Sequence, residues 1–334
     1  MADKIAIVMP VLDDWESFTA LVHEISETFT GSDLDFHICA IDDGSTTPFD
    51  SATLDLTPGS CVGSIAIIRL AANLGHQRAI AIGLCAIAET GDADRVLVMD
   101  SDGQDRPADI ATLLSMSRRQ PRHVVFAARA ERAEPRMFRF WYGLYRLLFH
   151  GLTGQAINFG NFCAMPMAAV RRLVHMPELW NHLAASVMRS RLPYTSVPTA
   201  RGRRTSGRSR MNLVALIAHG FSAMSVYTDQ IFIRVLLAAG LVAGLAGLAI
   251  AAAVTIRVAT HLAIPGWATT AIGDLLIMLL ETLVVMVASS LTMLARRSLR
   301  PILPIADCRC FVAGREEFRF GSRQAIVAAV RPAA

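Results

Sequence analysis

Short apolar runs alternate with segments of helical periodicity over residues 1–200 of the chain. The apolar runs have the length of strands and cover residues 5–11, 36–41, 64–70, 95–100 and 124–128. The segments between them repeat apolar residues at helical spacing and cover residues 15–29, 77–89 and 107–118. Continuously apolar strands joined by helices predict an α/β fold with a mostly parallel sheet covered on both faces. In such sheets, ligands bind at the carboxyl ends of the strands.

Two later stretches are long and apolar enough to cross a bilayer. Residues 235–256 carry no charge, and residues 275–295 carry only Glu281. At about 1.5 Å per residue, each stretch matches a hydrocarbon core of roughly 30 Å. Arginines concentrate on the flanks that face the rest of the chain. The positive-inside rule therefore predicts cytoplasmic termini and a short external loop.

These patterns divide the chain into four parts. We expect a catalytic α/β domain over 1–200, an arginine-rich amphipathic juxtamembrane segment over 201–230, two transmembrane helices over 231–296, and a cytoplasmic C-terminal tail over 297–334. Within the first span, small residues recur at Gly240, Gly244 and Gly247. This recurrence fits either helix–helix assembly into a homo-oligomer or a sequence that is simply rich in glycine and alanine.

The composition agrees with a membrane protein and argues against several other classes. Hydrophobic residues make up 53% of the chain and charged residues 18%, which is too apolar for an ordinary soluble enzyme. The basic residues do not interleave with aromatic residues in a soluble patch, so no nucleic-acid partner is expected. The six cysteines form no CxxC pair, which argues against structural zinc and a disulfide framework. The N-terminus runs straight into a strand, so we expect no signal peptide and a cytoplasmic first domain.

Acidic and polar residues follow three of the predicted strands. The second strand leads into residues 42–45 (DDGS), the third into residues 73–77 (NLGHQ), and the fourth into residues 100–105 (DSDGQD). Two carboxylates at positions i and i+2, where a strand leaves the sheet, can bind one hard cation such as Mg²⁺ or Mn²⁺ together with substrate phosphates. An EF-hand is excluded because Asp105 occupies the loop position that requires glycine. Dinucleotide-binding and P-loop motifs are absent.

In this order, the motifs resemble the family 2 glycosyltransferases of GT-A fold. The resemblance is carried by Pro10-Val11, DDGS (42–45), NLGHQRAIAIGL (73–84) and VLVMDSDGQDRP (96–107). Three later features narrow it to the polyprenyl-phosphate glycosyltransferases, and these are Arg129, NFGNF (158–162) and RRTSGRSRMN (203–212). That group contains dolichyl-phosphate mannose synthases and bacterial undecaprenyl-phosphate glycosyltransferases. The resemblance covers roughly residues 4–296.

The resemblance implies roles for particular residues. A divalent cation, Mg²⁺ or Mn²⁺, would be held against the donor diphosphate by Asp100, Asp102 and Gln104. The nucleotide-sugar would be bordered by Pro10, Asp13, Asp42, Asp43 and Ser101. The acceptor phosphate would meet Arg204, Ser209 and Arg210. The catalytic set would comprise Asp100, Asp102, Arg129 and Asn161. His76 and Gln77, at a helix start, are assigned a structural or donor-sensing role.

The sequence departs from the family pattern at three places. Asp13-Asp14 stands where the family usually has Asn-Glu. In residues 100–105, which we call the metal loop, Ser101 and Gly103 replace two residues of the family pattern without removing a ligand. Asn161 replaces the aspartate of Gly-Asp-Phe, which is sometimes assigned as the catalytic base. A hydroxyl acceptor needs such a base. A phosphate monoester, with a second pKa of about 6, is already mostly dianionic and does not.

We therefore expect inverting transfer of one sugar from a UDP- or GDP-sugar to a polyprenyl phosphate at the cytoplasmic face of a bacterial inner membrane. A processive polysaccharide synthase is an alternative, although such enzymes carry a Gln-x-x-Arg-Trp motif and more membrane helices than this chain. A non-catalytic membrane adaptor that retains the fold is another, and Asn161 motivates it. The arginines of residues 201–210 fit both contact with anionic membrane lipid and a clamp on the acceptor phosphate.

Overall fold

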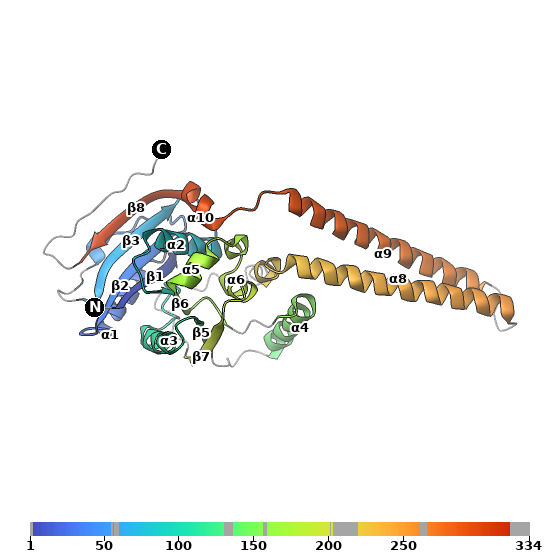
Figure 1. Ribbon diagram of the computed structural model, residues 1–334, viewed down its shortest axis with the longest axis horizontal. Helices are drawn as coiled ribbons and strands as arrows, with labels where there is room; N and C mark the ends of the chain where they lie inside the picture. The colour runs from blue at the N-terminus through green and yellow to red at the C-terminus, as the bar shows by residue number, and fades with distance from the viewer. Residues whose placement is uncertain are drawn as a thin grey trace. The chain divides into compact units, whose positions relative to one another are not determined.

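The computed structural model describes residues 3–54, 56, 60–129, 136–155, 159–200, 202, 220–260 and 266–320. The chain divides into two compact units. The first comprises residues 1–134, 157–226 and 302–334, and the second comprises residues 135–156 and 227–301. The sheet belongs to the first unit, and the two long helices belong to the second (Figure 1).

A mixed eight-stranded sheet forms the centre of the first unit. Its strands are β1 (Asp3–Val11), β2 (Leu34–Asp42), β3 (Val62–Leu70), β4 (Arg95–Val98), β5 (Val124–Arg129), β6 (Cys163–Pro166), β7 (Tyr194–Thr199) and β8 (Val312–Arg319). Their order is β7-β5-β6-β4-β1-β2-β3-β8. Strands β1 to β4 run parallel, as do β5 and β7, whereas β6 and β8 are antiparallel to their neighbours. The mostly parallel sheet predicted from the sequence is confirmed.

Helices cover both faces of the sheet, as the unbroken apolar strands require. The elements are α1 (Trp15–Thr28), α2 (His76–Thr90), α3 (Pro107–Arg119), α5 (Met167–Leu173) and α6 (Leu183–Arg189), with the short η1 (Ser51–Thr53) and η2 (Pro177–Trp180). Ile5 and Ile7 of β1 join the core formed with α1 and α3. Ala6 and Val8, which point to the opposite face, join the core formed with α2, α5 and α6.

Helix α2 lies very close to the sheet because a glycine faces it. A Cβ atom added at Gly83 would lie 2.5 Å from Val8 Cγ1 and 3.1 Å from Ile41 Cγ1. The missing side chain lets the helix backbone approach β1 and β2. Since α2 begins at His76, this close packing fixes the position of the residues at the start of the helix.

The C-terminal segment of the first unit returns to the sheet, which corrects the tail expected over 297–334. Helix α10 (Pro304–Asp307) and η3 (Cys308–Phe311) lead into β8, which pairs antiparallel with β3. The backbone N–H of Ala71 donates to Phe311 O at 2.8 Å, and Arg69 forms an ion pair with Glu316 at 2.9 Å. Residues 312–319 (VAGREEFR) form a polar edge strand. They lack the continuous apolar run that revealed the central strands, so hydrophobicity alone did not predict β8.

The second unit consists of α4 (Arg136–Thr153), α8 (Thr228–Ala259) and α9 (Trp267–Ser298). Helices α8 and α9 contain the two predicted spans and are long and apolar enough to cross a membrane, with mean hydropathy of 2.4 and 2.2 over their most apolar windows. Arg234 Nη1 donates to the carbonyl groups of His150 at 3.3 Å and Gly151 at 2.5 Å. The start of α8 thereby satisfies carbonyl groups in the last turn of α4.

The small residues of α8 do not all serve the same purpose. The alanines at 239, 246 and 253 are buried within the unit. A Cβ atom added at Gly240, Gly244 or Gly247 would meet nothing within 4 Å. The alanines therefore make the contacts within this chain, and assembly through the glycines stays a prediction.

Candidate active site

Polar loops follow three neighbouring strands at the centre of the sheet. Strand β1 lies between β2 and β4, and all three run parallel. Val11 is in register with Asp42, and Val8 is in register with Val98. The loops after β1, β2 and β4 therefore leave the same edge of the sheet. This is the edge at which parallel sheets bind ligands.

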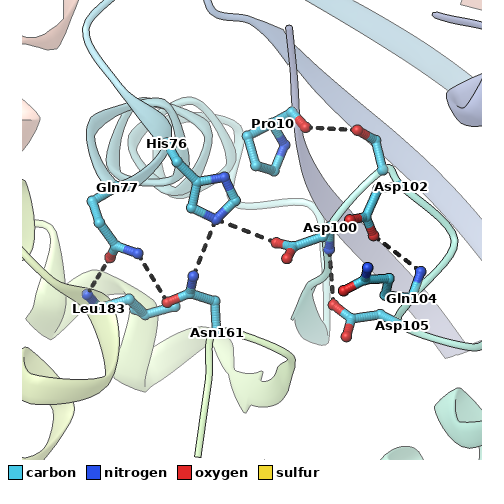
Figure 2. Close-up of polar contacts among 10 residues, drawn as sticks. Pro10, His76, Gln77, Asp100, Asp102, Gln104, Asp105, Asn161 and Leu183 are labelled. Carbon is cyan, nitrogen blue, oxygen red and sulfur yellow. Dashed lines mark hydrogen bonds and ion pairs between the residues drawn. The ribbon is translucent and has the colours of Figure 1, made fainter. Parts of the chain in front are cut away.

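The loop after β4 holds the two predicted metal ligands in a closed turn (Figure 2). The backbone N–H of Asp100 donates to Asp105 Oδ2 at 2.9 Å, and that of Gln104 donates to Asp102 Oδ1 at 3.0 Å. Gly103 closes the turn with a φ of 77°, a conformation that residues with side chains rarely adopt. Asp105, only 5% exposed, is a structural residue of this loop.

Ser101 ties the same loop to the end of β1. Its hydroxyl donates to the backbone oxygen of Pro10 at 3.0 Å, and the Ser101 side chain is buried. This hydrogen bond uses the single hydroxyl proton, so the oxygen of Ser101 can only accept from a ligand. The structure thus brings Pro10 and Ser101 to the metal loop, while their contacts with a nucleotide-sugar stay a prediction.

A row of polar side chains leads from Asp100, in the metal loop, past the start of α2 to the start of α6 (Figure 2). His76 Nε2 lies 3.2 Å from Asp100 Oδ1 and 3.1 Å from Asn161 Nδ2. Asn161 Oδ1 accepts from Gln77 Nε2 at 3.1 Å, and Gln77 Oε1 accepts from the backbone N–H of Leu183 at 2.8 Å. His76 and Gln77, predicted to be structural or donor-sensing, were not among the predicted catalytic or binding residues. Their position after β3, in the NLGHQ loop, is the signal that could have included them.

The charge around His76 favours its protonated form. Burial of the ring is the largest single effect and acts against protonation. The Asp100 carboxylate, by charge and hydrogen bond, together with the charges of Asp105 and Asp43, outweighs it and raises the pKa of His76 above its ordinary value. The side chain nevertheless keeps 42% of its surface exposed, so a ligand can reach the ring.

Asp43 serves as a clamp on the loop after β3. Its Oδ1 accepts from the backbone N–H of Leu74 at 2.7 Å, and its Oδ2 accepts from that of Gly75 at 2.9 Å. The side chain is only 3% exposed. Burial raises the pKa of Asp43, and the two backbone hydrogen bonds partly counter that rise. Asp43, predicted to bind the nucleotide-sugar, thus holds the residues immediately before His76, and a nucleotide contact stays a prediction.

Asp13 and Asp42 also make contacts between loops. Asp13 Oδ1 accepts from the backbone N–H of Thr46 at 2.6 Å and from its hydroxyl at 2.9 Å. Asp42 Oδ1 accepts from the backbone N–H of Ser45 at 2.8 Å, while Ser45 Oγ accepts from the N–H of Asp13 at 2.9 Å. These bonds join the loops after β1 and β2. The structure therefore brings both predicted nucleoside-binding carboxylates to one edge of the site.

The arginine-rich stretch begins beside the metal loop. The backbone N–H of Gly202 donates to Gln104 O at 2.9 Å. A Cβ atom at Gly202 would collide with Gly103 O and would lie 3.0 Å from Arg106 Cγ. Three predicted acceptor-binding residues lie outside the described residues, and these are Arg204, Ser209 and Arg210. Of Arg129, the structure describes the backbone, at the end of β5.

The residues of the metal loop fit a cation that arrives with its substrate. Within the described ranges, no three or more His, Cys, Asp or Glu side chains gather into a metal cluster. Mg²⁺ needs no such cluster, because it is commonly held by one or two carboxylates, water and substrate phosphates. Asp100 and Asp102 would supply the carboxylates, and Gln104 would add an amide oxygen. In the structure Asp100 pairs with His76 through Oδ1.

The fold and this site are those of a glycosyltransferase. The chain matches Glycosyl transferase family 2 over residues 6–177, which include strands β2 to β6, most of β1 and the metal loop, and it belongs to that family. The family match and the mostly parallel sheet together confirm the predicted GT-A catalytic domain.

Curated relatives are named for a lipid-phosphate acceptor. The undecaprenyl-phosphate 4-deoxy-4-formamido-L-arabinose transferase of Serratia proteamaculans is 25% identical over 259 residues, which cover 74% of each chain. The protein of the same name from Sodalis glossinidius is 26% identical over 227 residues, covering 64% of this chain and 65% of that one.

Two solved structures are similar to part of this chain. The glucosyl-3-phosphoglycerate synthase of Mycobacterium tuberculosis, crystallised with Mn²⁺ and UDP-glucose, is 14% identical, with a TM-score of 0.48 over 68% of this chain and 79% of that chain. The mannosyl-3-phosphoglycerate synthase of Rubrobacter xylanophilus is 14% identical, with a TM-score of 0.47 over 68% of this chain and 73% of that one.

Proposed function

We propose that this glycosyltransferase moves one sugar, with inversion, from a UDP- or GDP-sugar to a polyprenyl phosphate. The observation that carries the proposal is that the residue at the position of the family's carboxylate, in contact with the His76 side of the Asp100–His76 pair, is the amide of Asn161. An amide cannot remove a proton from a hydroxyl acceptor. The names of the curated relatives and the two helices of membrane-spanning length support a lipid acceptor.

The acceptor would supply its own nucleophile. A phosphate monoester has a second pKa of about 6, so its oxygen is largely unprotonated at neutral pH. That oxygen would attack the anomeric carbon from the side opposite the nucleoside diphosphate. A new C–O bond forms as the C–O bond to the diphosphate breaks, and the configuration inverts. No proton has to be transferred to the enzyme in this step.

The protein's task is then to hold two anions together and to stabilise the leaving group. Asp100 and Asp102, with Gln104, would hold Mg²⁺ or Mn²⁺, and a bound cation would stabilise the charge that develops on the diphosphate. Arg129, Arg204, Ser209 and Arg210 would neutralise the phosphates. These four roles are implied by the resemblance to the polyprenyl-phosphate glycosyltransferases.

The contact of Gly202 with the metal loop supports a common site for both phosphates. The Gly202 N–H donates to the backbone oxygen of Gln104, a residue that is itself a proposed metal ligand. The segment that carries the arginines therefore lies beside the proposed metal site at Gly202. The following helices would keep this segment at the membrane surface, with the catalytic unit on the cytoplasmic side. A polyprenyl phosphate in the cytoplasmic leaflet would present its phosphate to this arginine-rich segment.

The test uses the full-length protein in lipid nanodiscs with Mg²⁺ and a panel of radiolabelled UDP- and GDP-sugars. Polyprenyl phosphate is the acceptor, and the corresponding polyprenol, which bears a hydroxyl, is the matched control. We expect chloroform-soluble label with one donor and with the phosphate only. Label on the polyprenol would contradict the mechanism without a base. No labelled lipid with any donor would refute the transferase and favour a non-catalytic adaptor.

Two variants separate the metal loop from its surroundings. Asp102→Asn keeps the size of the side chain and removes a charge, so product formation should fall by about a hundredfold or more. Asp50→Asn, at the start of the short helix η1, removes the same charge from an exposed residue away from the metal loop and should leave turnover unchanged. Full turnover by Asp102→Asn would refute the metal assignment alone, since the transfer itself would still be observed.

A further inference from the structure

Side chains from distant parts of the chain form one hydrogen-bonded row that ends beside Asp100 (Figure 2). Gln77 is the second residue of α2, Asn161 precedes β6, and Leu183 starts α6. The row runs from the Leu183 N–H through Gln77 and Asn161 to His76 Nε2, with successive distances of 2.8, 3.1 and 3.1 Å. Gln77 is only 9% exposed, so water cannot easily replace either of its partners.

The backbone N–H of Leu183 sets the direction of the two bonds that join Leu183, Gln77 and Asn161. A main-chain N–H can only donate, so the Gln77 atom that it contacts is the oxygen. The other end of the Gln77 amide is then the NH₂ group, which donates, and the Asn161 atom facing it is also oxygen. The NH₂ group of Asn161 must therefore face His76. Amide orientation is usually an assignment, but here one obligatory donor determines it.

This orientation gives residue 161 the opposite chemistry to the carboxylate that the family usually has there. The Asn161 NH₂ group has two protons. One points toward His76 Nε2, which can accept it only when the ring is neutral with its proton on Nδ1, because the protonated ring donates from Nε2 to Asp100. Among the described residues no contact uses the other proton. A phosphate oxygen held near Asp100 would be stabilised by such a donor, whereas a carboxylate at the same place would repel it.

We propose that Asn161 donates this second N–H to a phosphate oxygen, and that Gln77 is a positioning residue that keeps the Asn161 amide turned for that purpose. The phosphate belongs either to the diphosphate of the nucleotide-sugar or to the acceptor, and the experiment below separates the two. The inference rests on the proposed function and deepens it. It turns the loss of the family's carboxylate into a gain of phosphate binding.

Four substitutions in the full-length protein test the two parts of the proposal. Asn161→Leu removes the donor without adding charge, and Asn161→Asp keeps the contact with Gln77 but replaces the donor by an acceptor. Gln77→Glu still accepts from the Leu183 N–H but presents oxygen to Asn161, so the Asn161 amide should turn over. Gln77→Met removes both bonds and leaves the amide free to rotate. Gln155→Glu, at an exposed residue just after α4, is the matched control for added charge.

The first measurement is calorimetric titration with Mn²⁺ and pyrophosphate, which needs no turnover. The second is KM for polyprenyl phosphate. Asn161→Leu and Gln77→Glu should each either lower the affinity for pyrophosphate or raise KM for polyprenyl phosphate by about tenfold. This is the size expected for one hydrogen bond to a charged group. A change in pyrophosphate affinity assigns the N–H to the donor, and a change in KM alone assigns it to the acceptor. Gln77→Met should have a smaller effect, and Gln155→Glu none.

Several outcomes would overturn the proposal. If Asn161→Asp binds pyrophosphate and turns over as well as the parent or better, residue 161 does not act as a donor. If Asn161→Leu is impaired but Gln77→Glu is not, Gln77 does not orient the amide. Thermal melting of each variant identifies any that has unfolded. If the parent protein labels no lipid, the proposed function fails, and the pyrophosphate titration still decides whether Asn161 binds phosphate.

Discussion

The clamp made by Asp43 leads to a prediction that contrasts two adjacent aspartates. Asp42 and Asp43 are both buried, and both were predicted to contact the nucleotide-sugar. In the structure, Asp43 uses both carboxylate oxygens to hold the backbone N–H groups of Leu74 and Gly75, whereas Asp42 Oδ1 holds that of Ser45. The same conservative change at each position, Asp→Asn, should therefore have different consequences.

The size of the effect follows from the geometry of the clamp. Asn at position 43 keeps one oxygen, which can still accept from Leu74 N–H at 2.7 Å, but its NH₂ group would face the Gly75 N–H that now lies 2.9 Å from Oδ2. One hydrogen bond to a charged group, about 1.5–3 kcal/mol, is replaced by two opposed donors. Burial of the Asp43 carboxylate, which also raises its pKa, offsets part of the stability gained from its hydrogen bonds. We expect the loop to lose about 2 kcal/mol of local stability.

Hydrogen exchange measures this loss where it occurs. About 2 kcal/mol corresponds to a roughly 30-fold faster exchange of the Leu74 and Gly75 amides in Asp43→Asn, since each 1.4 kcal/mol is tenfold. Turnover should fall as well, because Gly75 precedes His76. In Asp42→Asn, exchange at Leu74 and Gly75 should stay unchanged, while affinity for the nucleotide should fall if Asp42 borders the nucleoside. Equal exchange at these amides in both variants would refute the clamp.

Three further predictions concern backbone approach and helix ends. Gly202→Ala should push the chain away from the metal loop and lower turnover by about ten- to hundredfold. Gly314→Ala, with open space around its Cβ position, is the control and should leave turnover unchanged. Normal turnover in Gly202→Ala would refute the contact. Gly83→Ala should destabilise the first unit by about 1–3 kcal/mol through overpacking against the sheet, measured by denaturation, with Gly240→Ala as a control in open space. Arg234→Met should speed hydrogen exchange in the last turn of α4, because two carbonyl groups lose their donor, and unchanged exchange would contradict that role.

The sequence by itself determined the features that depend on local patterns. The five apolar runs gave the central strands, because a strand buried on both faces must be apolar throughout. The two long apolar stretches, of which the second carries only Glu281, predicted α8 and α9, because a helix that crosses a bilayer needs about 20 predominantly apolar residues. Asp100 and Asp102 were placed correctly at the sheet edge, since the carboxyl ends of parallel strands meet there.

Only the tertiary structure decided the features that join distant residues. Strand β8 is polar and owes its place to backbone pairing with β3, so no apolar pattern marked it. The sequence suggested a nucleotide contact for Asp43, but the two N–H groups that it holds come from another loop. The direction of the Asn161 amide depends on Gln77 and on the N–H of Leu183. Such pairings arise when the chain folds back on itself, and neither spacing nor hydrophobicity records them.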